Sequence, residues 1–251
     1  MFLDSGHMIG QAICHDYQII DNKAVDWLQQ HSACIELKAT QRIICSNEYY
    51  QQKLIGTAPE IYTRQSVYLK LLMVLEQLDP YLALYIFDSY RSLACQGALF
   101  DQIYNELNQA HPEWSNEQLE VEVRKYVAHP DEPSRFAVPP HNSGGAIDLA
   151  LVDLRANTAL DFGTGFDDPT VLSQTDYFEQ DYQPEFGISL ERWQLIRQNR
   201  RLLFNVMKRV GFVNFTSEWW HYDLGDCLWA KSVQSSWFYP SMEHDVDKLS
   251  G

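Results

Sequence analysis

Apolar residues recur three or four positions apart in two stretches of the chain, as one face of an amphipathic helix requires. The first stretch covers residues 64 to 79 and stops before Pro80, where a helix cannot easily continue. Its apolar positions are Val67, Leu71, Val74, Leu75 and Leu78. The second covers about 190 to 209 and is followed by Gly211, a typical C-terminal cap. Its predicted core residues are Leu190, Trp193, Leu195, Ile196, Leu203 and Val206.

Two further helices are predicted between these stretches. One covers residues 92 to 109, and the next begins after Ser115, because Gln118 three residues later completes a capping box. Prolines at positions 130, 133, 139 and 140 then predict an extended loop. Residues 157 to 188 are rich in Asp, Gly and Thr without clear periodicity, which predicts a long surface loop. We expect the 110 to 140 region and this loop to surround a cleft.

Strand patterns lie between the predicted helices. The segment Tyr81–Phe87 is a short apolar run rich in strand formers. In Ala146–Val152 the side chains alternate between two faces, so that Asp148 shares its face with two alanines. The segment Phe212–Leu224 predicts either a strand pair or a strand with a turn, around Thr216 and Ser217. Together these elements predict a single α+β domain over residues 1 to 251, with helices packed on a small, mostly antiparallel sheet.

The amino-acid composition limits the kinds of molecule that this protein can be expected to bind. The chain has 251 residues, of which 45% are hydrophobic and 21% charged, and this suits one globular domain with a full core. A net charge of −15 argues against a nucleic acid or an anionic membrane as partner, because a negative surface repels phosphates. We therefore expect a small substrate, while the composition leaves the oligomeric state open.

The cellular location follows from two further features. No run of about 18 apolar residues occurs, and the first residues lack a basic segment followed by a long apolar one. The five cysteines form no Cys-x-x-Cys pair, which favours reduced thiols over a zinc ribbon or a complete disulfide framework. We expect a cytoplasmic protein.

Two short segments, His141–Asp148 and Ser217–His221, contain the residues of a catalytic zinc site. Taken alone, His141 reads as a solvated loop histidine and His221 as a histidine bonded to backbone in an aromatic core. Asp148 is stronger evidence for a metal site, because a carboxylate buried in an apolar strand must be paired, protonated or metal-bound. Zinc in hydrolases usually takes three nitrogen or oxygen ligands and keeps one position open, and Glu218 would be the spare general base.

Two more charged residues are candidates for contact with substrate. Arg91 follows the predicted strand at Tyr81–Phe87, where it is either an ordinary surface residue or a group that stabilises an oxyanion. Asp167 either is solvated or receives a substrate ammonium group. The chain has no His-Glu-x-x-His, Gly-x-Ser-x-Gly, P-loop or Gly-x-Gly-x-x-Gly motif, which excludes the helical zincin arrangement and removes support for serine hydrolase and nucleotide-binding functions.

With these residues in place, the chain resembles the D-alanyl-D-alanine dipeptidases of the zinc D,D-peptidase and hedgehog-like superfamily, peptidase family M15. The superfamily motif is Ser-x-His-x-x-Gly-x-Ala-x-Asp, followed later by Glu-x-x-His. The residues that fit it are His141, Gly144, Ala146, Asp148, Glu218 and His221. The resemblance covers about residues 35 to 226, which implies that the core of the catalytic domain lies there.

The resemblance implies hydrolysis of a free D,D-dipeptide, D-Ala-D-Ala, to two molecules of D-alanine. It implies one zinc ion per chain, with the ligands His141, Asp148 and His221. In this reading Glu218 activates the zinc-bound water.

The resemblance also implies two roles in binding substrate. Arg91, in the turn that begins at Asp88, would stabilise the oxyanion together with zinc. Asp167, at the end of the Gly163–Asp167 loop, would hold the free amino end of the dipeptide.

One position departs from the motif: Pro139 stands where the family has a serine that helps to bind substrate. Proline has neither a hydroxyl nor a backbone N–H, although Ser143 offers a hydroxyl nearby. Two alternatives therefore stay open. One is a zinc D,D-carboxypeptidase or endopeptidase acting on peptidoglycan stem peptides. The other is a non-catalytic, zinc-stabilised binding module, against which the presence of both Glu218 and Arg91 argues.

Overall fold

The computed structural model describes residues 5–15, 28–29, 32–124, 127 and 138–250. Its largest sheet has the strand order β3, β5, β6, β9, β8, with β7 paired to the end of β6. The bounds are β3 (Ile43–Cys45), β5 (Leu82–Asp88), β6 (Ala146–Asp153), β7 (Thr158–Ala159), β8 (Val213–Asn214) and β9 (His221–Asp223). β3 lies parallel to β5, and the other neighbours are antiparallel. The predicted α+β fold with a mostly antiparallel sheet is confirmed.

Two short sheets and the helices complete the described part. The short sheets pair β1 (Leu28–Gln29) with β10 (Trp237–Phe238) and β2 (Cys34–Glu36) with β4 (Tyr62–Arg64). The helices are α1 (Ser5–Gly10), α2 (Glu48–Gln51), α3 (Gln65–Gln77), α4 (Leu93–Ala110), α5 (Asn116–Val123), α6 (Pro140–Ser143), α7 (Leu190–Arg209), α8 (Cys227–Ser232) and α9 (Glu243–Ser250). Within the described ranges, no helix combines the length and apolarity needed to cross a membrane.

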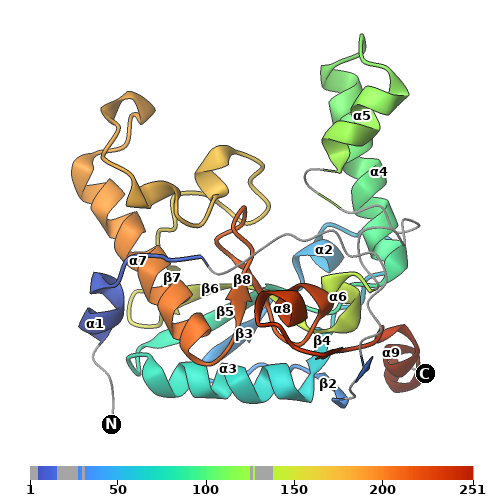
Figure 1. Cartoon of the computed structure of the whole chain (residues 1–251), viewed down its shortest axis with the longest axis horizontal. Coiled ribbons are helices and arrows are strands. Elements are labelled where there is room, and N and C mark those ends of the chain that lie inside the picture. The colour runs from blue at the N-terminus through green and yellow to red at the C-terminus, as the bar shows by residue number, and fades with distance from the viewer. Residues whose placement is uncertain (1–4, 16–27, 30–31, 125–126, 128–137, 251) are drawn as a thin grey trace.

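The main core lies between the sheet and the helices α3 and α7, which Figure 1 shows below the sheet and at its left side. Buried side chains of both helices join those of β5 and β6 in one apolar cluster. The predicted helix at 64 to 79 is confirmed as α3, and the predicted capping box of α5 is present. Gly211 has a φ of +102°, the left-handed conformation of a residue that follows a helix end.

The prediction for the core face of α7 is wrong at two positions. Leu190 and Leu195 are each 48% exposed, whereas Trp193 and Ile196 are fully buried. Adjacent helical residues differ in direction by about 100°, so Leu195 turns away from the core that Ile196 enters. Leu190 lies in the first turn of the helix.

Residues 157 to 188 are more structured than the predicted surface loop. They contain β7 and the 3₁₀ turns η1 (Val171–Ser173), η2 (Tyr177–Glu179) and η3 (Pro184–Phe186), and they bury Phe162 and Phe178. The fully buried Arg200 of α7 donates hydrogen bonds to the carbonyls of Phe162, Leu172 and Gln174. The segment is therefore held from α7, a long-range contact that local periodicity does not encode.

The predicted proline loop also needs correction near its end. Pro130 and Pro133 lie outside the described residues, but Pro139 and Pro140 begin the one-turn helix α6, which contains His141. Proline suits the first position of a helix, because its φ is already helical and its missing N–H would have no partner there. His141 thus lies in a short helix and not in a loop.

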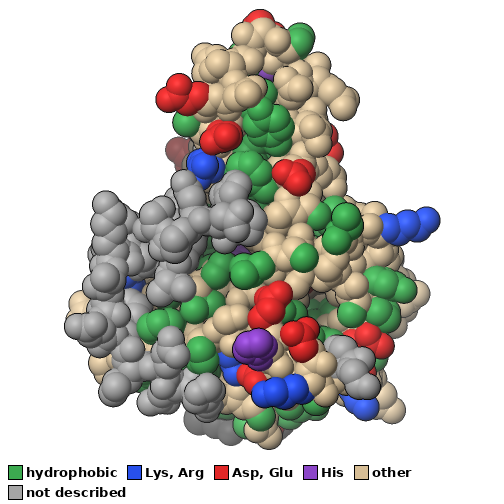
Figure 2. All heavy atoms as spheres, turned by 90° about the vertical axis from the view of Figure 1, so that its right-hand side faces the viewer, with side chains coloured by type: hydrophobic (Ala, Val, Ile, Leu, Met, Phe, Trp, Pro, Cys, Tyr) green, Lys and Arg blue, Asp and Glu red, His purple; other side chains and the backbone are tan. Residues whose placement is uncertain are grey.

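Helices α4 and α5 project away from the sheet (Figure 1). Figure 2 shows this projection rising above the rest of the molecule, with hydrophobic and acidic side chains on its surface. Their inner faces form a small cluster of their own around Cys95, Leu99 and Phe100. The charged candidates come together at the main sheet, beside the first turns of α4.

Candidate metal centre

The strand register aligns three charged side chains across the sheet. Asp148 on β6 pairs with His221 on β9 on one side and with Asp88 on β5 on the other. The β5–β6 register shifts between Ile86 and Asp88, so a bulge brings Asp88 opposite Asp148. Helix α6 ends just before β6 and adds His141 to the same place.

The two histidines and Asp148 form a buried cluster of possible metal ligands. His221 Nδ1 lies 3.1 Å from His141 Nε2 and 3.0 Å from Asp148 Oδ1. His141 Nε2 lies 3.4 Å from Asp148 Oδ2. Zinc bonds of about 2.0–2.1 Å in a tetrahedron separate ligand atoms by about 3.3 Å, so these spacings suit one ion. The predicted ligands are brought together.

The outer nitrogens of both rings are already bonded. His141 Nδ1 donates to the carbonyl oxygen of Ser89 at 2.7 Å, and His221 Nε2 lies 2.9 Å from Asp223 Oδ1. With its proton on the outer nitrogen, each ring leaves its inner nitrogen free to bind a metal ion. A cation held between these nitrogens and Asp148 would replace the proton that His221 Nδ1 otherwise shares with Asp148. The donor set of two imidazoles and one carboxylate fits zinc.

Burial and neighbouring charges shift the pKa values of the cluster in different directions. Burial lowers the pKa of His141 to about 3, which keeps this ring neutral and able to bind a metal. Burial also acts to lower the pKa of His221, but the carboxylates of Asp223 and Asp148 outweigh it and raise that pKa well above its usual value. Burial raises the pKa of Asp88 to about 7, although Arg91 opposes this. The cluster therefore favours added positive charge.

Arg91 is fixed beside the cluster by several partners. Its Nε donates to Asp88 Oδ2 at 2.9 Å, and its Nη1 donates to Gln96 Oε1 at 3.2 Å. Its Nη2 donates to the hydroxyl of Tyr49 at 3.0 Å and lies 3.7 Å from Asp148 Oδ2. The guanidinium is only 10% exposed, so it is held in one orientation at the edge of the ligand cluster.

Glu218 lies at the open side of the cluster. Its Oε2 is 3.9 Å from His221 Nδ1, and its side chain is 27% exposed, whereas the ligand side chains are 2% to 9% exposed. Desolvation raises the pKa of Glu218 to about 8, with Asp148 adding to the rise and His221 opposing it. A carboxyl with a pKa close to neutral can accept and return a proton.

Asp167 reaches the site from the Gly163–Asp167 loop. Phe166 stacks on Phe87 with ring centroids 4.6 Å apart, and Asp167 itself has a left-handed φ of +58°. Asp167 is exposed as a residue, but its carboxyl forms a hydrogen bond with Tyr49, and desolvation raises its pKa to about 6. The loop thus brings an acid to the entrance, next to the hydroxyl that contacts Arg91.

Several residues of the site were not predicted. Asp223 had a usable signal, because it lies two residues after His221 on a strand and therefore shares its face. Tyr49 and Gln96 had no local signal, since they reach Arg91 through the fold. Ser143 is tied to backbone, donating to the carbonyl of Pro140 at 2.6 Å and accepting from Gly145 N at 3.0 Å.

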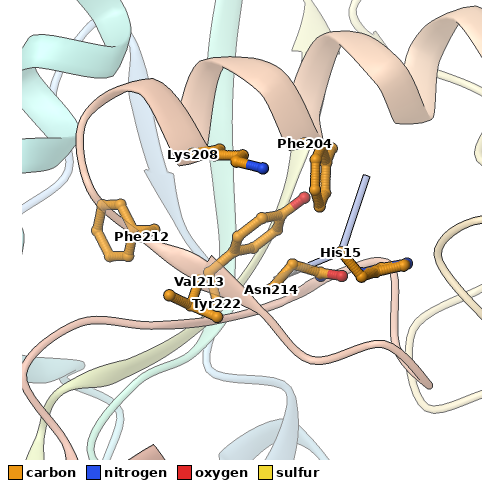
Figure 3. Close-up of a pocket in the computed structure, with 7 residues that line it drawn as sticks. All are labelled: His15, Phe204, Lys208, Phe212, Val213, Asn214 and Tyr222. Atoms are coloured by element: carbon orange, nitrogen blue, oxygen red, sulfur yellow. The ribbon is translucent and has the colours of Figure 1, made fainter. Parts of the chain in front are cut away.

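A separate cavity lies behind β9, and Figure 3 shows its lining. It measures about 290 Å³ including its open mouth and is bordered by His15, Phe204, Lys208, Phe212, Val213, Asn214 and Tyr222. Tyr222 follows His221 on the strand, so the two side chains point to opposite faces of the sheet. This cavity is not part of the metal centre.

Known proteins match this chain over much of its length. The family model described as D-Ala-D-Ala dipeptidase, peptidase M15, matches residues 55–239. A D-alanyl-D-alanine dipeptidase of Synechocystis sp. is 26% identical over 185 residues, which cover 71% of each chain. The enzymes of the same name from Escherichia coli and Enterococcus faecium are 39% identical over 84 residues and 35% identical over 86 residues. Each of these two matches covers 34% of this chain and 37% of the relative. The chain belongs to the D-Ala-D-Ala dipeptidase family of M15 peptidases and is a metallopeptidase.

Proposed function

We propose that this protein hydrolyses free D-Ala-D-Ala to two molecules of D-alanine, with one zinc ion per chain. His141, Asp148 and His221 would hold the ion. The observation that carries this proposal is the buried cluster of two imidazoles and one carboxylate, with ligand atoms 3.0 to 3.4 Å apart and both outer ring nitrogens bonded. A bound zinc ion would supply a Lewis acid and lower the pKa of water to about 7.

Glu218 is proposed to move the proton. It lies at the exposed edge of the cluster, where a water molecule and a peptide can reach it. Its carboxylate takes a proton from the attacking water and passes it to the leaving amine. Desolvation raises the pKa of Glu218 above its usual value, which makes its carboxylate a stronger base.

Arg91 is proposed to bind the scissile carbonyl. Its guanidinium is held by Asp88, Gln96 and Tyr49 before substrate arrives. A donor fixed in advance stabilises the negative charge of a tetrahedral intermediate without the cost of reorganising. This favours a role in the transition state over simple binding.

Asp167 is proposed to receive the ammonium group of the dipeptide. Its carboxyl lies near Tyr49 and Arg91, on the loop that borders the site. A carboxylate at this position pairs with a free ammonium but leaves a blocked amine without a partner. The site should therefore prefer a free dipeptide to a longer or N-acylated peptide.

The test is amine release by the zinc-loaded protein from D-Ala-D-Ala, L-Ala-L-Ala and N-acetyl-D-Ala-D-Ala. Rapid cleavage of the free D,D-dipeptide alone supports the proposal. Glu218→Ala should lower the rate by about 10²- to 10⁴-fold while zinc stays bound. Equal cleavage of the N-acetylated peptide would remove the role of Asp167 and favour a carboxypeptidase. No cleavage of any substrate, with one zinc ion bound, would favour a binding module.

A further inference from the structure

The C-terminal segment contacts the turn that carries His141, although it lies after the residues matched by the family. Met242 N donates to the carbonyl of Asn142 at 2.8 Å, and the fully buried Met242 side chain packs on Gly144. A Cβ at Gly144 would lie 2.2 Å from Met242 Sδ, so the two segments fit closely. Buried Arg64 bridges them by donating to the carbonyls of Ser143 at 2.8 Å and Pro240 at 2.7 Å.

Glu243, the first residue of α9, forms the central contact. Its Oε2 accepts hydrogen bonds from Asn142 Nδ2 at 2.5 Å and from the Tyr90 hydroxyl at 2.9 Å. The same oxygen lies 3.4 Å from Leu93 N, in the first turn of α4. One carboxylate oxygen therefore joins the segment before β6 to the segment after β5.

These partners are direct neighbours of the residues in the site. Asn142 follows His141, and Tyr90 precedes Arg91. The two segments are also bonded to each other, since Asn142 Nδ2 donates to the carbonyl of Arg91 at 3.2 Å and Arg91 N donates to the carbonyl of His141 at 3.2 Å. Glu243 thus completes a small hydrogen-bond network between the segments that contain His141 and Arg91.

We infer that Glu243 is a positioning residue that holds His141 and Arg91 in their working arrangement. It contacts neither of their side chains, and it acts through Asn142 and Tyr90. Without this carboxylate, the amide of Asn142 and the hydroxyl of Tyr90 lose a shared acceptor, and the two segments can shift apart. Displacements of about 1 Å in such sites can lower rates by about 10²-fold. The inference rests on the proposed function for the roles of His141 and Arg91.

The experiment compares Glu243→Ala with Glu243→Gln, using Asp247→Ala as the matched control. Gln keeps an oxygen that accepts both hydrogen bonds, and Asp247 is an exposed acid on the same helix. We would measure the zinc dissociation constant by competition with a chelator, kcat and KM for D-Ala-D-Ala, and the melting temperature. Glu243→Ala should weaken zinc binding by about 3- to 10-fold, less than loss of a direct partner of a ligand. It should also lower kcat more than it changes KM.

Glu243→Gln should keep most of the zinc affinity and kcat, and Asp247→Ala should match the wild type. Unchanged zinc affinity in Glu243→Ala, or equal losses in Glu243→Ala and Glu243→Gln, would overturn the inference. If Glu243→Ala does not fold, Tyr90→Phe removes one donor instead, and an unchanged kcat there would overturn it. Zinc affinity tests the inference even if the wild type does not cleave D-Ala-D-Ala, so the two failures are distinguishable.

Discussion

The two faces of β9 differ in how their polar groups are satisfied. On one face, both nitrogens of His221 lie near carboxylates, with Asp148 on the inner side and Asp223 on the outer side. On the other face, the hydroxyl of Tyr222 is buried without a hydrogen-bond partner among the described residues, beside the ring of Phe204 (Figure 3). The cavity lies on the second face and the charged groups on the first. The cluster of possible metal ligands and this cavity are therefore on opposite faces of the strand.

The largest expected loss of zinc binding and activity comes from Asp148→Ala, a change on the charged face. This variant removes one of three proposed ligands and leaves two imidazoles facing each other. We expect loss of bound zinc and of dipeptide hydrolysis, measured as metal content after dialysis and as amine release. Retention of one zinc ion per chain would contradict the ligand assignment and weaken the contrast between the two faces of β9.

Asp223→Ala should cause the next largest loss, a loss of zinc affinity. It removes the acceptor at His221 Nε2 and leaves Nδ1 free to take the proton. Loss of such an outer partner typically lowers metal affinity by about 10- to 100-fold. Chelator competition measures this, and Asp223→Asn, which keeps an acceptor oxygen, should recover part of the loss. Equal affinity in the wild type and Asp223→Ala would show that His221 is oriented by other contacts.

A smaller effect is expected on substrate binding when a change of pH alters the protonation of Asp167. Desolvation raises its pKa to about 6, so the carboxylate is ionised above this pH and protonated below it. Binding of a substrate ammonium should therefore weaken as pH falls through about 6, seen as a rise in KM for D-Ala-D-Ala. In Asp167→Asn, KM should be high and should no longer change over that range. The same rise in the variant would assign the pH dependence to another group.

The smallest effect is expected on the opposite face, from Tyr222→Phe. The lost hydroxyl has no hydrogen-bond partner among the described residues, so zinc affinity and kcat should stay at wild-type values. The free energy of unfolding should rise by up to about 1 kcal/mol, because an unsatisfied buried group is removed. Urea denaturation measures this change. A large loss of zinc affinity in this variant would mean that the two faces are coupled.

The sequence predicted the parts of the site that carry their own local signal. Asp148 is an acid inside an apolar strand, and a buried carboxylate needs a partner wherever the fold places it. Helix α3 was predictable because one of its faces meets the core in a regular period. The placement of His141 beside His221 needed the motif as well, because α6 is too short to show a period.

The parts of the fold and of the site that were not predicted depend on contacts between distant segments. Tyr49 meets Arg91 across 42 positions in the sequence, and Glu243 meets Asn142 across 101. Arg200 shapes the loop after Phe162 through backbone carbonyls, which every residue type has. Such contacts follow from how the elements pack, so no spacing along the chain predicts them.

The site forms only when the three strands pair in the register that aligns Asp88, Asp148 and His221. A shift of β6 by one residue would move Asp148 to the Tyr222 face and separate it from two histidines that are 80 positions apart in sequence. An ion that binds only the correct register would stabilise that register over its neighbours by mass action. Metal supply during synthesis would then influence the yield of correctly paired chains as well as the activity of finished ones.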